Sequence, residues 1–139
     1  MFKRSLLAML AIFVVWSGWE FLLHGVLLGA TYLETPELWR PVNEMKMELM
    51  HVVRAISTIG FVLIYVRLVD RKSMSSALCY GLLIGIIFGI SMGYGTYSVQ
   101  PIPQKLALSW FLGELVKMLA GGLLLGLIVR PESEPSTDN

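Results

Sequence analysis

Residues 77–97 of the chain read ALCYGLLIGIIFGISMGYGTY and contain no charged side chain. A helix of about 20 apolar residues crosses the ~30 Å hydrocarbon core of a bilayer, so this stretch predicts a membrane-spanning helix. Glycine recurs at every fourth position, at Gly81, Gly85, Gly89 and Gly93. Glycine weakens a helix but lets membrane helices approach closely, so the pattern predicts a face that packs on another helix. A sliding surface between helices and a contact between copies of the chain are two other interpretations of this face.

The composition of the whole chain agrees with a membrane protein. Of its 139 residues 55% are hydrophobic and 15% are charged, and the mean hydropathy is +0.68. A soluble domain of this size cannot bury so much apolar surface, so we expect the lipid bilayer to be its main partner. The net charge of +1 argues against nucleic acid, which requires a concentrated basic surface. The single cysteine excludes an internal disulfide and a dithiol centre.

Three more apolar runs are long enough to span a membrane. They cover roughly residues 5–29, 47–69 and 106–129. Pro101 and Pro103 separate the last run from the one before it, because proline ends a helix. The sequence therefore predicts an all-α protein, a four-helix transmembrane bundle that forms a single domain over residues 1–130. The polar residues 131–139 are expected to form a disordered cytoplasmic tail.

Lysine and arginine are distributed unevenly between the two sides of such a bundle. One side carries Lys3, Arg4, Arg67, Arg71, Lys72 and Arg130. The other side carries Arg40, Lys46 and Lys105, together with Glu34, Glu37, Glu44 and Glu48. Because cytoplasmic loops are enriched in Lys and Arg, we expect both termini to lie in the cytoplasm.

The first loop on the outer side has features of a short helix. Thr35-Pro36-Glu37 resembles a helix start, with a threonine cap, a proline in the first turn and an early acidic residue. Aromatic rings such as that of Trp39 favour the membrane interface. We therefore expect a short interfacial helix, although an ordinary tether is an alternative.

Five ionisable residues lie inside the apolar runs: Glu20, His24, His51, Arg54 and Glu114. A charge in a bilayer is costly and normally faces a partner inside the bundle. With a rise of ~1.5 Å per residue, Glu20, Arg54 and Glu114 lie at similar depths, and the two histidines lie about one turn above them. We therefore expect three helices to converge on one polar column that opens to the outer side.

Three interpretations of this column remain open. In the first it is structural, and Arg54 bridges Glu20 and Glu114 to lock the bundle. In the second it binds or conducts a proton, an ion or a small polar ligand, as carboxylate and histidine chains do. In the third it binds a transition metal, which a nearby arginine would oppose by repelling the cation. The candidate metal ligands are His24, Glu48 and His51.

Motifs of known enzyme classes are absent from the sequence, which contains no Gly-x-Ser-x-Gly, no HExxH and no phosphate-binding glycine loop. This disfavours an enzyme without excluding one, and no cofactor other than a metal is expected. The leading hypothesis is a small membrane protein that binds or conducts a small ligand, ion or proton. The alternative is a non-catalytic accessory subunit of a larger membrane complex.

Several segments also resemble a known group of proteins. They are Glu20-Phe-Leu-Leu-His24-Gly25, Tyr32, Leu38-Trp39-Arg40-Pro41, Met45, Pro101-Ile-Pro103 and Leu106-Ala-Leu-Ser-Trp110. In these residues the chain resembles small four-helix inner-membrane proteins of bacteria whose function is unknown. The resemblance implies a multi-pass protein of the bacterial inner membrane and implies no catalytic activity.

Overall fold

A computed structural model describes residues 1–129 of the chain. Within these residues all regular structure is helical and no strand occurs, which confirms the all-α prediction. Four helical segments are long and apolar enough to cross a membrane, and they indicate a multi-pass membrane protein. They are Phe2–Leu27, Met47–Leu68, Met74–Gly95 and Gln104–Ile128. The predicted tail, 131–139, lies outside the described residues.

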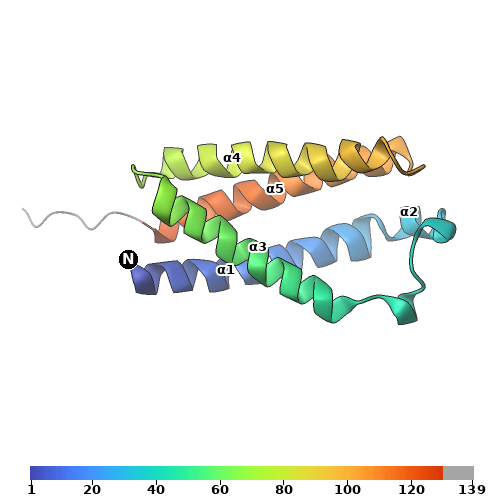
Figure 1. Cartoon of the computed structure of the whole chain (residues 1–139), viewed down its shortest axis with the longest axis horizontal. Helices are drawn as coiled ribbons and strands as arrows, with labels where there is room; N and C mark the ends of the chain where they lie inside the picture. The colour runs from blue at the N-terminus through green and yellow to red at the C-terminus, as the bar shows by residue number, and fades with distance from the viewer. Residues whose placement is uncertain (130–139) are drawn as a thin grey trace, which may run out of the picture.

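The helices are built from shorter elements, several of them irregular (Figure 1). Their order is α1 (Phe2–Glu20), η1 (Phe21–Leu27), α2 (Gly29–Leu33), η2 (Pro36–Leu38), η3 (Val42–Glu44), α3 (Met47–Leu68), α4 (Met74–Ile90), η4 (Ser91–Gly95) and α5 (Gln104–Ile128). Two of them, η1 and η4, are π-helical turns that prolong α1 and α4. Such π-helical turns are rare in proteins overall, but those that occur often lie at functional sites. The first of the two, η1, contains His24.

The glycines of α4 lie against the backbone of α5. A Cβ atom added to Gly81 would lie 2.5 Å from the carbonyl oxygen of Met118, and one added to Gly93 would lie 2.4 Å from that of Ala107. The approach is reciprocal, because a Cβ on Gly122 of α5 would lie 2.5 Å from a carbonyl oxygen of α4. Only residues without a side chain permit this spacing, which gives α4 and α5 the most extensive contact in the fold.

The end of the bundle that carries the N-terminus and the connection 69–73 is filled by an apolar core, here called the lower core. Its buried members are Ala8, Ile12, Trp16, Phe61, Val62, Tyr65, Ala77, Met118, Leu125 and Val129. Two aromatic polar groups at this end are satisfied, since the Trp16 indole donates to the Lys117 carbonyl at 2.8 Å and the Tyr80 hydroxyl donates to the Phe61 carbonyl at 2.8 Å. The buried hydroxyl of Thr58 on α3 has no hydrogen-bond partner among the described residues. The lower core therefore contains aromatic and aliphatic side chains from all four long helices.

The opposite end, here called the loop end, is more open. Figure 1 shows α3 crossing α1 and then diverging from the other helices toward this end. Every residue from 40 to 53 is exposed, and α3 makes its main helix contacts with α1. At the loop end, α3 and the loop before it therefore lack the close packing of the lower core, whereas α1, α5 and the connections between helices pack a second, smaller apolar core there. The buried members of this second core are Leu23, Leu28, Ile102, Leu106 and Ala107.

The connection between α2 and α3 contains two single 3₁₀ turns, η2 and η3. Where the sequence predicts a short interfacial helix, the structure has a 3₁₀ turn of three residues that starts at Pro36 and does not continue, because Pro41 follows closely. Thr35 does not cap it with its side chain. Instead the hydroxyl of Thr35 donates to the Thr31 carbonyl at 3.3 Å and accepts the indole N–H of Trp39 at 3.0 Å.

Candidate functional site

A cluster of four charged side chains lies between the lower core and the loop end. Its centre is Glu20, at the end of α1. Arg54 of α3 donates to Oε2 of this carboxylate from Nε at 3.1 Å and from Nη2 at 2.5 Å. Lys117 of α5 donates to Oε1 at 3.0 Å. One carboxylate thus joins three helices through two cations.

Lys117 also binds the second acid of the cluster, Glu114. Its ammonium group donates to Oε1 at 2.6 Å and lies 2.6 Å from Oε2. Yet Oε2 is buried and accepts no well-aligned hydrogen bond from the described residues. The ammonium group is also 5.5 Å from the centre of the Trp16 ring, within the range of a cation–π contact. The cluster holds two acids and two bases, so its formal charge is zero.

The expectation that Arg54 bridges both carboxylates is wrong. Within residues 1–129 Arg54 pairs with Glu20 alone, and Lys117 is the bridge between Glu20 and Glu114. The reason is geometric. Lys117 lies one turn after Glu114 on α5, which packs directly on α1, whereas α3 reaches the cluster only across α1.

The remaining N–H groups of Arg54 determine which ring nitrogen of His51 acts as the acceptor. Nη1 of Arg54 donates to the Ser17 hydroxyl at 3.2 Å and lies 3.2 Å from Nδ1 of His51. Arginine can only donate, so Nδ1 of His51 accepts and the ring is neutral with its proton on Nε2. A second proton on His51 would replace this hydrogen bond by repulsion between two cations.

The cluster is partly shielded. The exposed fractions of its side chains are 9% for Arg54, 12% for Lys117, 16% for Glu114 and 21% for Glu20. Below it lies the lower core, and on the other side His51 is exposed toward the loop end. The cluster is therefore covered on the side of the lower core and less covered on the side of the loop end.

His24 belongs to a separate aromatic group nearer the loop end. Its Nδ1 lies 2.6 Å from the Tyr32 hydroxyl, which accepts the indole N–H of Trp110 at 2.9 Å. Because the indole only donates, the Tyr32 oxygen is an acceptor for Trp110, and its own proton is available for Nδ1 of His24. Burial raises the pKa of Tyr32, and the hydrogen bond from Trp110 opposes that rise. No hydrogen bond joins His24 to Glu20 within the described part of the chain, so the predicted column consists of two separate groups.

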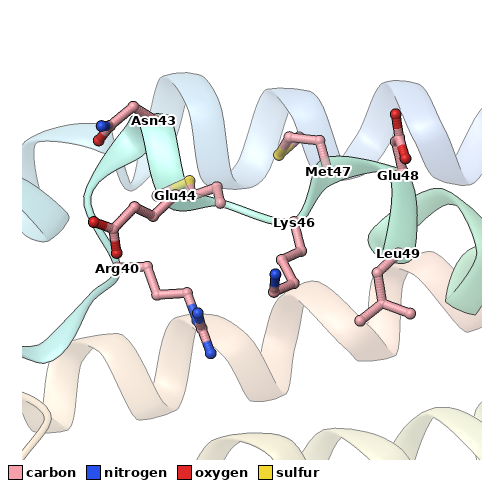
Figure 2. A pocket seen from close by; sticks show the side chains of 8 residues that line it. Arg40, Asn43, Glu44, Lys46, Met47, Glu48 and Leu49 are labelled. Carbon is pink, nitrogen blue, oxygen red and sulfur yellow. The ribbon is translucent and has the colours of Figure 1, made fainter.

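The three candidate metal ligands do not come together. His24 binds Tyr32, His51 binds Arg54, and Glu48 lines a hollow at the loop end (Figure 2). Among residues 1–129 no group of three or more His, Cys, Asp or Glu side chains is placed to hold a metal ion. The structure therefore provides no donor set on which a metal site can be argued.

Sequence reasoning missed several members of these groups. They are Lys117, Ser17, Tyr32 and Trp110. A signal for Lys117 was present, because a lysine in the middle of an apolar run, one turn from Glu114, needs a partner as much as an arginine does. No pattern marks Ser17, whose role depends on the crossing of α1 and α3.

Comparisons of this chain with protein-family models, with curated proteins and with solved structures give no match. The geometry of the two polar groups is therefore the basis for a functional assignment.

Proposed function

We propose that this chain is a multi-pass protein of the inner membrane whose charged cluster binds a proton or a small polar ligand from the outer side. The observation that carries the proposal is Oε2 of Glu114, which is buried and lies 2.6 Å from the Lys117 ammonium group but accepts no well-aligned hydrogen bond from the described residues. A donating solute that binds there gains a hydrogen bond and leaves the ion pair in place, whereas a proton neutralises Glu114 and weakens its ion pair with Lys117. Buried carboxylate oxygens that accept no hydrogen bond are rare and call for an explanation of this kind.

The position of the cluster favours binding over conduction. His51 is exposed at the loop end, where α3 diverges, so the charges are approached from that side. On the other side the lower core closes the bundle with large buried side chains such as Trp16 and Tyr65. The excess of Lys and Arg near the termini makes the loop end the outer side, with both termini in the cytoplasm.

A second candidate function is that of an accessory subunit in a larger membrane complex. The pairing of all four charges favours it, since a balanced cluster can serve only to hold three helices together. The exposure of α3 over residues 47–53 also favours it, because a partner helix would cover this surface.

Infrared difference spectroscopy of the protein in lipid nanodiscs tests the proposal. The pH is lowered from about 8 to about 5, the interval in which sites that handle protons change state. We expect an absorption band of a protonated carboxyl group in the wild type. The band should be lost in Glu114→Gln and kept in Glu37→Gln, a matched control at an exposed position of η2.

The opposite result is equally informative. If wild type and Glu114→Gln give the same difference spectrum, Glu114 stays ionised and the cluster takes up no proton there. Adding small polar solutes at fixed pH then tests the remaining half of the proposal through the fluorescence of Trp16, which contacts Lys117. A fluorescence signal that no solute changes would favour the accessory subunit.

A further inference from the structure

The end of the bundle that the lower core fills is strongly basic on its surface. It carries the first turn of α1, the last turn of α3 and the connection 69–73 (Figure 1). Asp70 is the one acidic residue in these three segments. Their basic residues, here called the basic end, are Lys3, Arg4, Arg67, Arg71 and Lys72.

Most of this positive charge is not paired inside the protein. Lys3, Arg67 and Arg71 are exposed, and none of them forms an ion pair with another residue in the range 1–129. Lys72 is different, because its ammonium group donates to the Val69 carbonyl at the end of α3. The three exposed side chains therefore remain available to an external anion.

The exposed charges lie where lipid headgroups lie. On this side the membrane-spanning helices begin at Phe2 and end at Leu68, so Lys3 and Arg67 are each next to such a boundary. Phe2 and Leu68 themselves are apolar and are 76% and 73% exposed, which suits contact with acyl chains. Phospholipids surround these helix ends in a bilayer, and the charge of the end decides which headgroups it favours.

The loop end has the opposite balance of charge. Its loops and helix starts carry three basic residues, Arg40, Lys46 and Lys105, and four acidic ones, Glu34, Glu37, Glu44 and Glu48. Clusters of four or more Lys and Arg beside a membrane-spanning helix attract anionic headgroups, whereas a zwitterionic headgroup carries no net charge. Selection by charge is therefore expected at the basic end and not at the loop end.

From these observations we infer that the basic end binds anionic phospholipids in preference to zwitterionic ones, through Lys3, Arg67 and Arg71. The site is a surface that several headgroups share and is not a pocket for a single lipid. It lies apart from the charged cluster, so the inference depends neither on the proposed proton or ligand binding nor on the orientation of the chain.

Electron paramagnetic resonance of spin-labelled lipids tests this inference in a bilayer. The full chain is placed in phosphatidylcholine vesicles with a trace of phosphatidylglycerol or phosphatidylcholine labelled on the acyl chain. The motionally restricted fraction of each label gives its relative association with the protein. At about 0.01 M salt we expect clearly more restricted phosphatidylglycerol than phosphatidylcholine. At about 1 M salt most of this difference should vanish, because the screening length falls from about 30 Å to about 3 Å. This comparison needs no variant.

Two matched variants locate the preference. Arg67→Gln/Arg71→Gln should lower the association of phosphatidylglycerol relative to phosphatidylcholine about fivefold or more, the contribution of one Lys or Arg at an anionic surface. Arg40→Gln/Lys46→Gln removes the same number of exposed cations from the loop end and should leave the ratio unchanged.

Three outcomes would overturn the inference. The first is equal restriction of the two labels by the wild type at low salt. The second is a preference that Arg40→Gln/Lys46→Gln abolishes and Arg67→Gln/Arg71→Gln keeps. The third is a preference that appears only in Glu132→Gln/Glu134→Gln, which would show that acidic residues of the chain itself, beyond the described range, occupy the basic end.

Discussion

Replacing Lys117 with methionine should destabilise the bundle more than any other single change in the charged cluster. Lys117 holds Glu20 at 3.0 Å and Glu114 at 2.6 Å. Methionine keeps the apolar stem that packs beside Trp16, so the change isolates the loss of charge. Glu20 retains Arg54, but Glu114 is left without a cation in the described structure.

The size of the effect follows from that remaining charge. Removing one partner of a buried ion pair costs about 3–5 kcal/mol, because the other charge stays desolvated and unpaired. The Glu114 side chain is 16% exposed, so screening reduces this only slightly, and we expect the free energy of unfolding to fall by about 3 kcal/mol. Unfolding by SDS in mixed micelles at neutral pH measures it. The double variant Lys117→Met/Glu114→Gln should recover most of the loss, since the unpaired charge is gone.

Arg54→Met provides the matched comparison. It removes the cation that binds Glu20 alone, so adding Glu114→Gln should recover little of its loss. The reasoning is refuted if Lys117→Met unfolds within about 1 kcal/mol of the wild type, less than a buried pair should cost. It is also refuted if Glu114→Gln rescues Arg54→Met as well as it rescues Lys117→Met, since Arg54 would then be the partner of Glu114.

Three further predictions concern packing, ionisation and orientation. Gly81→Ala should lower the free energy of unfolding by about 1–3 kcal/mol in a melting assay, because the backbones of α4 and α5 must separate to admit the new Cβ. Gly60→Ala is the control and should be neutral or stabilising, since no atom lies within 4 Å of its new Cβ. Burial raises the pKa of Tyr32 above its ordinary value of 10.0, so the folded protein keeps this hydroxyl neutral to a higher pH than the unfolded chain does. The contribution of Tyr32 to stability is therefore complete below pH 10.0 and is lost as the pH rises through the raised pKa. Its tyrosinate absorbance, taken as the difference between wild type and Tyr32→Phe, should therefore appear only above pH 10.0. Alkaline phosphatase fused after Asn43 should be active and fused after Arg71 inactive, and the reverse pattern would place the termini outside.

The membrane-spanning helices were predictable because their signal is local. An apolar run of about 20 residues has to be helical in a bilayer, where every backbone group needs an internal partner. All four predicted runs appear as helices within a few residues of their expected bounds. That Glu20, Arg54 and Glu114 meet was also predictable in outline, because charges at equal depth in a membrane seek one another.

The glycine pattern shows what such local sequence signals cannot predict. Gly81 and Gly85 lie against α5, whereas Gly25 and Gly29 have the same spacing but contact no other helix. Spacing places residues on one face of a helix, but it does not say whether another helix covers that face. A covering helix exists for the glycine face of α4 but not for the face that carries Gly25 and Gly29.

The sequence by itself determined that four apolar helices form and that the charges within them need partners. Only the tertiary structure decided that Lys117, and not Arg54, joins Glu20 to Glu114, and that His24 turns to Tyr32 and Trp110 instead of joining the charges. The physical reason is one of range. Helix formation, and the cost of placing a charge in a membrane-spanning run, depend on residues close by in the sequence. The choice of an ion-pair partner depends instead on crossing angles and distances between helices far apart in the chain.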